Sequence, residues 1–164
     1  MPQTFMLGIM NRSEMMRAVK GKDTAPERAV RRWLYARGFR YRKNVRQLPG
    51  QPDIVMRPYA TVIFVHGCFW HRHPGCKVAS MPRTNAKFWW RKFNANMGRD
   101  IDHEKRLKRM GWHVEVIWEC EINEKKLSDI AARLKKRRPS LPARRLPRYD
   151  ALRDAAELVM ATEL

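Results

Sequence analysis

The stretch TVIFVHGCFWHRHPGC spans residues 61–76 and carries the strongest fold signal in the chain. Residues 61–66 are almost all β-branched or aromatic, and they predict a β-strand that ends at His66. The residues from 67 to 82 are rich in glycine, proline, cysteine and histidine and have no regular period, which predicts an irregular loop. The stretch therefore predicts a strand that leads directly into a loop of side chains able to bind metal.

Helical patterns lie on both sides of this stretch. Before it, Thr24, Pro26 and Glu27 supply a helix cap, a first-turn proline and a capping box, and Gly38 ends that helix. The predicted elements, in order, are a helix at 25–37, strands at 39–44, 53–56 and 61–66, a helix at 85–110, a strand at 112–118 and a helix at 122–136. This order predicts an α/β or α+β domain in which helices flank a small mixed sheet.

The composition indicates a folded and strongly basic protein. Its 164 residues suit one domain, and the 44% of hydrophobic residues are enough for a packed core. A net charge of +19 favours a polyanionic partner, and nucleic acid fits it better than a membrane surface. No apolar run reaches the roughly 18 residues of a transmembrane helix, and the N-terminus lacks a secretory signal pattern. We therefore expect a cytoplasmic protein.

All three cysteines of the chain fall into one candidate metal site. Cys68, His73 and Cys76 lie in the irregular loop, and Cys120 follows the last predicted strand. Three thiolates and an imidazole make a tetrahedral zinc set, and four protein ligands leave no open position, so such a zinc would be structural. The alternative is three free cysteines and a surface histidine, and the spacing alone leaves both open.

A second constellation combines a carboxylate with two histidines. Asp53 stands at the start of a strand after a tight turn, His66 ends the next strand, and His71 follows in the loop. Many nucleases hold magnesium between strand-borne ligands and the phosphate, and a neutral histidine can take a proton from water. Each residue also has a local explanation, since Asp53 fits a turn cap and Glu27 completes the capping box. Only the set as a whole favours a nuclease.

The string His66-Gly67-Cys68-Phe69-Trp70-His71 resembles the signature of the very-short-patch-repair (Vsr) endonucleases. The resemblance runs from about residue 11 to 134, and the other matching motifs are 16–18, 23–27, 48–53, 83–84, 88–89 and 118–120. It implies a restriction-endonuclease-like fold. It also implies an enzyme that uses Mg²⁺ to nick double-stranded DNA on the 5′ side of the thymine in T:G mismatches, which arise when 5-methylcytosine deaminates.

The resemblance also implies roles for residues of the second constellation. Asp53 matches the magnesium-binding aspartate, and Val65 matches the position whose backbone carbonyl helps to hold that metal. The better-known members have threonine at the position of Val65, but a backbone ligand does not depend on the side chain. His71 matches the proposed general base, and His66 and Glu27 match residues that support the hydrated metal and the phosphate.

Two further groups of residues take their roles from the same resemblance. The structural zinc ligands match Cys68, His73, Cys76 and Cys120, although Pro74-Gly75 makes the spacing one residue longer than the family pattern. The aromatic wedge that enters the DNA stack beside the mismatch matches Phe69, Trp70 and Trp89, and Met16 matches a residue that enters from the opposite groove. From local pattern alone, large apolar side chains of this kind are more often part of a core.

We expect a loosely ordered lead at 1–12, a Vsr-like endonuclease domain at 13–136 and a basic tail rich in proline and arginine at 137–164. The expected state is a monomer that binds mismatched double-stranded DNA, with mismatch-repair accessory proteins as further candidate partners. Two alternatives remain. One is a zinc-stapled, non-catalytic DNA-binding module, and the other is a sequence-specific restriction-type nuclease.

Overall fold

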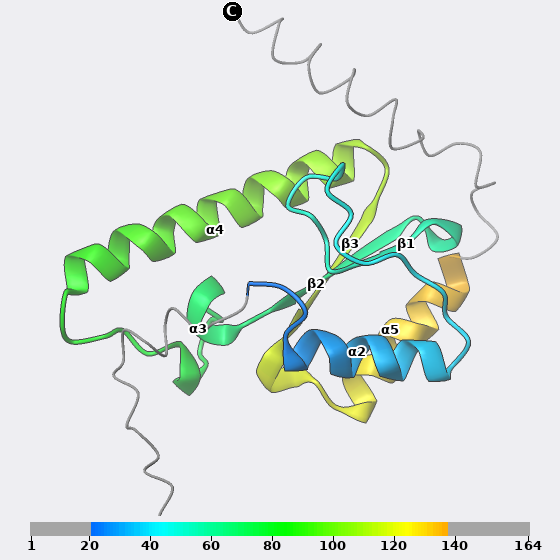
Figure 1. Ribbon diagram of the computed structural model, residues 1–164, viewed down its shortest axis with the longest axis horizontal. Coiled ribbons are helices and arrows are strands. Elements are labelled where there is room, and N and C mark those ends of the chain that lie inside the picture. The colour runs from blue at the N-terminus through cyan, green and yellow to red at the C-terminus, as the bar shows by residue number, and fades with distance from the viewer. Residues whose placement is uncertain (1–20, 138–164) are drawn as a thin grey trace, which may run out of the picture.

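Residues 21–137 form a three-stranded mixed sheet with helices on both faces in the computed structural model of the protein (Figure 1). The central strand β2 (Thr61–His66) pairs antiparallel with β1 (Ile54–Met56) and parallel with β3 (His113–Trp118). The helices are α2 (Ala25–Ala36), α3 (Cys68–His71), α4 (Ala86–Arg109) and α5 (Glu124–Arg137), and 3-10 turns lie at η1 (Arg57–Tyr59), η2 (Lys77–Ala79) and η3 (Glu119–Glu121). This architecture confirms the predicted mixed sheet flanked by helices.

The two faces of the sheet bury separate hydrophobic clusters. One cluster joins Ile54 and Ile63 of the strands to Leu34 of α2 and Ile130 of α5. The other joins strand residues of the opposite face to Leu107 of α4. Figure 1 shows the same division, with α4 on one side of the sheet and α2 and α5 on the other. Side chains of a strand alternate between faces, so one short sheet supports both layers.

The parallel pairing of β2 with β3 determines where the functional loops meet. The register places His66 opposite Trp118, so the two strands end at the same edge of the sheet. The loop that begins at Gly67 and the turn that contains Cys120 both leave from this edge. Residues about fifty positions apart in sequence are therefore neighbours in space.

The predicted helices and most strands are confirmed, whereas the strand predicted at 39–44 is wrong. Only Arg42 pairs there, through backbone hydrogen bonds of 2.9 and 2.8 Å with Val55. Phe39 is buried and Tyr41 packs beside it, which accounts for the apolar alternation without a strand. Asn44 then has a φ of 49°, a left-handed conformation that turns the chain away from the sheet.

The irregular segment predicted at 67–82 contains two short helical elements, α3 and η2. Met16, the predicted lead at 1–12 and the predicted tail beyond Arg137 lie outside the described residues. Within residues 21–137, none of the helices combines the length and the apolar character that crossing a membrane requires.

Candidate active site

A cleft of about 920 Å³ opens at the edge of the sheet where β2 ends. Its walls come from the start of α2, the 48–53 turn, the end of β2, α3 and the middle of α4. Four of the predicted catalytic residues line it, namely Glu27, Asp53, His66 and His71, and Val65 lines it as well. The fold therefore brings the whole predicted catalytic set to one cavity.

Asp53 is held by the backbone of the neighbouring strand. The amide N–H of Val65 donates a hydrogen bond of 2.7 Å to Oδ2 of Asp53. Burial raises the pKa of Asp53 from 3.8 to about 6, against the opposing effect of the Val65 hydrogen bond. Below about pH 6 a cation that binds this carboxylate must displace a proton, so acidic conditions would oppose cation binding at Asp53.

His66 and His71 form a stacked pair beside Asp100. Their ring centroids lie 3.9 Å apart with the planes inclined by only 8°. Burial and then the charge of His71 lower the pKa of His66 to about 4, so His66 is neutral at physiological pH. His71 donates from Nδ1 to Oδ2 of Asp100 at 2.6 Å. That bond leaves Nε2 of His71 free to accept a proton.

Asp100 stays ionised in this arrangement. Burial acts to raise its pKa, but the hydrogen bond and the charge of His71 outweigh burial and hold the pKa below its usual value. An ionised carboxylate on Nδ1 orients the ring and stabilises the imidazolium that forms when Nε2 takes a proton. The pair is therefore competent for general base catalysis.

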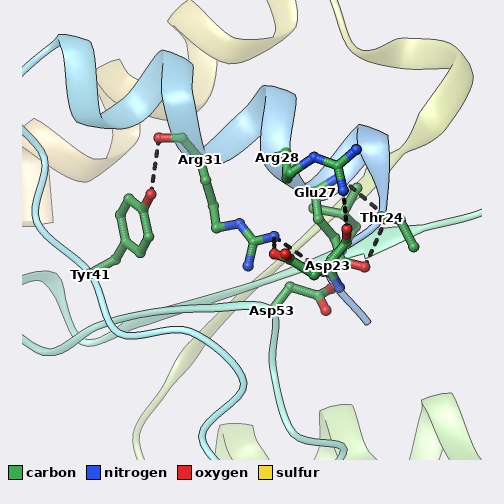
Figure 2. Close-up of polar contacts among 8 residues, drawn as sticks. Asp23, Thr24, Glu27, Arg28, Arg31, Tyr41 and Asp53 are labelled. Carbon is green, nitrogen blue, oxygen red and sulfur yellow. Dashed lines mark hydrogen bonds and ion pairs between the residues drawn. The ribbon is translucent and has the colours of Figure 1, made fainter. Parts of the chain in front are cut away.

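Glu27 is fixed by the first turn of α2 (Figure 2). The backbone N–H of Asp23 donates to Oε2 of Glu27 at 2.9 Å, and the Thr24 hydroxyl donates to Oε1 at 2.8 Å. The amide of Glu27 donates in return to the Thr24 hydroxyl at 3.4 Å, as predicted for a capping box, whereas the Glu27 carboxylate accepts from the N–H of Asp23 in place of that of Thr24. The carboxylate of Glu27 therefore helps to cap α2 and also lines the cleft.

Arg31 lies behind this carboxylate and was not predicted from the sequence. Its guanidinium is 6% exposed, pairs with Asp23, and lies 3.5 Å from Oε2 of Glu27. Its Nη1 is buried without a hydrogen-bond partner among the described residues. Burial raises the pKa of Asp53 overall, and the positive charge of Arg31 acts against that rise, so Arg31 is the internal counter-ion of three carboxylates.

We expect Arg31→Met to lower the free energy of unfolding by about 3 kcal/mol, because it leaves the buried Glu27 carboxylate without its cation. Denaturant unfolding measures this difference. The control is Arg32→Met, which removes the same charge one residue along α2, from an exposed side chain. Equal stability of the two variants would show that Arg31 does not balance the buried charge.

The four predicted zinc ligands come together at the same edge of the sheet. Their donor atoms all lie within 4.8 Å of one another. Cys76 and Cys120 have their sulfurs 3.9 Å apart, and His73 Nδ1 lies 3.6 Å from the Cys68 sulfur and 3.2 Å from that of Cys120. Tetrahedral zinc with Zn–S near 2.3 Å requires sulfurs about 3.8 Å apart, so the donor set fits zinc.

The neighbours of His73 favour the same use. Its ring stacks on Trp118 at 4.4 Å, and its Nε2 lies 3.6 Å from Oε1 of Glu121. A carboxylate near Nε2 places the proton there and leaves Nδ1 as the ligand atom. Gly75, with a φ of 71°, makes the turn that accommodates the longer spacing between His73 and Cys76.

The three aromatic residues predicted to form a wedge also cluster. The ring of Phe69 lies 5.2 Å from that of Trp70 and 5.5 Å from that of Trp89. All three are half-buried, and Phe69 and Trp89 pack on the buried ring of Phe93, whereas Phe88 and Trp90 are exposed. Trp70 lines the cleft, so the cluster forms part of its rim.

Asp100 and Asn96 are two residues of the cleft that were not predicted from the sequence. Asn96 donates to the backbone carbonyl of Trp70 at 3.1 Å and so joins α4 to α3. Both side chains lie on one face of a long helix whose polar residues have no distinctive spacing. One signal was present, since Asp100 is the first carboxylate after Asp53.

The site has the form of a metal-dependent nuclease. A buried strand-end carboxylate and a histidine oriented by a second carboxylate share one cleft in a chain of net charge +19. This class of enzyme supplies a ligand for a divalent cation and a base for water at the same phosphate.

Comparison with known proteins identifies the family. A profile of the family DNA mismatch endonuclease Vsr matches residues 6–77. Type II nicking enzyme V.NmeAIP of Neisseria meningitidis is 46% identical over 114 residues, which cover 70% of this chain and 81% of the relative. Type II nicking enzyme V.XorIIP of Xanthomonas oryzae is 43% identical over 124 residues, or 76% and 89% of the two chains.

DNA mismatch endonuclease Vsr of Escherichia coli is 41% identical over 121 residues, which cover 73% of this chain and 77% of the relative. The chain therefore belongs to the DNA mismatch endonuclease Vsr family, and it is a DNA endonuclease. The resemblance that rested on residues 66–71 is confirmed, and the alternative of a non-catalytic binding module is wrong.

Proposed function

We propose that this protein nicks double-stranded DNA 5′ to the thymine of T:G mismatches that arise from deamination of 5-methylcytosine, by Mg²⁺-dependent hydrolysis of the phosphodiester bond. The observation that carries the proposal is the cleft that joins Asp53 to the His71–Asp100 pair. A pure binding protein has no need of a buried carboxylate and an oriented base in one cavity. The names and identities of the relatives support the same activity.

Asp53 and the backbone carbonyl of Val65 would hold the magnesium ion. A carboxylate and a carbonyl are the hard oxygen ligands that Mg²⁺ prefers. Because burial disfavours an uncompensated negative charge on Asp53, it also favours a cation bound beside that charge. Bound there, the ion would supply Lewis acidity to the phosphate and neutralise its developing charge. His66 and Glu27, on either side of the cleft, would hold the water shell and orient the phosphate.

His71 acts as the general base. Its Nε2 accepts a proton from the attacking water, and Asp100 stabilises the resulting imidazolium through the 2.6 Å bond to Nδ1. His66 is neutral and stacked on the ring of His71, so it adds no positive charge that would oppose this protonation.

The second metal is a structural zinc held by Cys68, His73, Cys76 and Cys120. All four ligands are protein groups, so the site has no open position for catalysis. The ligands join the loop after β2 to the turn after β3, and this loop also carries His71 and Trp70. Zinc would therefore hold the base and the rim of the cleft in place.

Recognition of the mismatch rests on the aromatic cluster of Phe69, Trp70 and Trp89. A wobble pair stacks less well than a Watson–Crick pair, so an inserted wedge costs less free energy beside the mismatch. Lys92 lies 5.5 Å from the centre of the Trp70 ring and would bring a positive charge to the phosphates beside it. Met16, proposed to enter from the opposite groove, lies outside the described residues.

Several broader expectations belong to the same proposal. We propose a restriction-endonuclease-like fold, for which the mixed sheet and flanking helices are the support. The domain at 13–136, the monomeric state, the cytoplasmic location and accessory repair partners stay predictions. A sequence-specific restriction-type nuclease remains the alternative, and substrate choice decides between the two.

The test is nicking of labelled duplexes that differ at one pair, T:G, T:A or C:G, with and without Mg²⁺. The proposal expects a nick 5′ to the thymine of the T:G duplex only, and only with the metal. Equal cleavage of matched duplexes at a fixed sequence would establish the restriction-type alternative. Cleavage in the presence of a chelator would exclude Asp53 as a magnesium ligand.

On the same duplexes, Trp70→Ala is expected to lower the ratio of T:G to T:A cleavage by at least about tenfold. The reason is that the free-energy cost of inserting the wedge differs between the T:G and the T:A pair. The control is Tyr35→Ala, which removes an exposed ring of α2 that does not line the cleft. An unfolded Trp70 variant would mark this residue as core. A folded variant with an unchanged ratio would place recognition in contacts to the edges of the wobble pair.

A further inference from the structure

A second surface, at the start of α4, combines exposed apolar groups with positive charges that form no ion pair within residues 21–137. Met81, Ala86, Lys87, Trp90 and Arg91 surround a shallow hollow of about 450 Å³. Trp90 is 61% exposed, which is far more than the half-buried Trp89 beside it. We call these five residues the outer surface of α4, although Met81 precedes the helix. None of them lines the catalytic cleft.

The charge around this surface has one sign. No Asp or Glu occurs between Asp53 and Asp100, whereas that interval contains eight Lys and Arg. Among the described residues, neither Lys87 nor Arg91 forms an ion pair with a carboxylate. An uncompensated positive surface around an exposed indole favours a polyanion with apolar groups between its charges. The sugar–phosphate backbone of DNA has this chemistry.

The position of the surface matches DNA that continues beyond the cleft. The first half of α4 extends past the end of the sheet, beside α3 (Figure 1). Trp90 precedes Asp100 by ten residues, a distance of about 15 Å along the helix axis. For a duplex that runs along α4, this distance corresponds to roughly four base pairs at ~3.4 Å each. The aromatic cluster at Trp89 adjoins the surface, so the two are continuous.

We propose that the outer surface of α4 binds the DNA backbone about four base pairs from the nick, outside the catalytic cleft. Lys87 and Arg91 pair with phosphates, and the Trp90 ring packs on the deoxyribose between them. The contact adds affinity for every duplex and takes no part in the chemistry. It requires that DNA is the substrate and does not depend on mismatch specificity.

The experiment measures binding of full-length variants to matched and mismatched duplexes over a range of salt concentrations. The test variants are Trp90→Ala and the pair Lys87→Gln with Arg91→Gln. The matched control is Lys135→Gln with Lys136→Gln, which removes the same charge from exposed positions at the end of α5. Nicking at saturating DNA is read in parallel, and thermal melting verifies that each variant folds.

The two test variants are expected to weaken binding in different ways. The double charge variant lowers affinity for all duplexes and reduces the salt slope by about two, as for the loss of two phosphate contacts. Trp90→Ala lowers affinity by about tenfold and leaves the salt slope unchanged, because it removes only apolar contact. Both nick at the normal rate once DNA is saturating. The control pair retains normal affinity at moderate salt.

Duplex length supplies a second, independent arm. Duplexes are shortened from one side or the other until only about three base pairs flank the nick, which is less than the reach of α4. Shortening on one side is expected to weaken binding of the unchanged protein by more than about tenfold, because it removes the two phosphate contacts together with the Trp90 contact. On that short duplex the Trp90 variant binds as tightly as the unchanged protein, because the contact is already lost.

Four outcomes would overturn the proposal. Equal losses of DNA affinity in the Lys87/Arg91 pair and in the Lys135/Lys136 pair would show that net charge alone causes the effect. Unchanged DNA binding by the Trp90 variant would assign the surface to another partner, and a concentration-dependent dimer that this variant dissociates would identify a second copy of the chain. If Trp90→Ala still weakens binding to both shortened duplexes, the DNA contact lies elsewhere. Because matched duplexes are included, loss of T:G preference alone leaves the proposal intact.

Discussion

The Asp53→Asn protein is expected to bind mismatched duplex normally and to leave it uncut. The amide has the shape of the carboxylate but no charge to hold Mg²⁺, so the rate falls by about a thousandfold or more. The fold should survive, because the carboxyl is already protonated below about pH 6 in the metal-free protein. Single-turnover nicking and fluorescence anisotropy with the same labelled duplex separate the two effects.

A matched control for this variant is Asp129→Asn, which neutralises an exposed carboxylate of α5. It should nick as the unchanged protein does. Full activity of Asp53→Asn would remove Asp53 from the mechanism. Loss of binding together with loss of nicking, in a folded protein, would mean that Asp53 shapes the DNA surface rather than the reaction.

The Cys120→Ser protein is expected to lose its zinc and to melt at least about 10 °C lower than the unchanged protein. Cys120 is the only ligand from the turn after β3, so its loss releases the loop that carries His71 and Trp70. Metal analysis should find one zinc per chain in the unchanged protein and none in the variant. Thermal melting measures the loss of stability.

Chelation provides the control, because all three cysteines belong to the same site. A chelator that removes zinc should destabilise the unchanged protein as much as Cys120→Ser does, and it should add nothing to the effect of the variant. A folded and active protein without zinc would contradict the structural role. Separate effects of chelator and variant would show that another site binds the metal.

Local sequence patterns were sufficient to predict most of the elements. The capping box at Thr24 and Glu27 places the start of α2, and Gly38 has the positive φ expected of a helix end. The failure at 39–44 has a physical cause. Alternating apolar side chains predict one buried face but not a pairing partner, and β1 is only three residues long. The segment is therefore buried on one side without forming a ladder.

The active site was predictable only in part, for a related reason. Asp53, His66 and His71 lie within 19 consecutive positions, so the local sequence motif is sufficient to identify them as candidates. Asp100 and Arg31 come from two different helices, and the packing of these helices on the sheet brings Asp100 to His71 in the cleft and Arg31 to the Glu27 carboxylate behind it. No local pattern encodes this packing. Partners that meet through tertiary contacts need the fold before their chemistry can be recognised.

The parallel pairing of β2 with β3 also bears on how the protein forms. β3 follows β2 only after the loop and the whole of α4, so the sheet closes through a long-range contact, which is slow in folding. During synthesis, the chain has all of the proposed catalytic residues once Asp100 emerges, but it lacks β3 and Cys120. The nascent nuclease therefore stays incomplete until residues 113–120 have been made. We expect that it cuts no DNA until the sheet has closed.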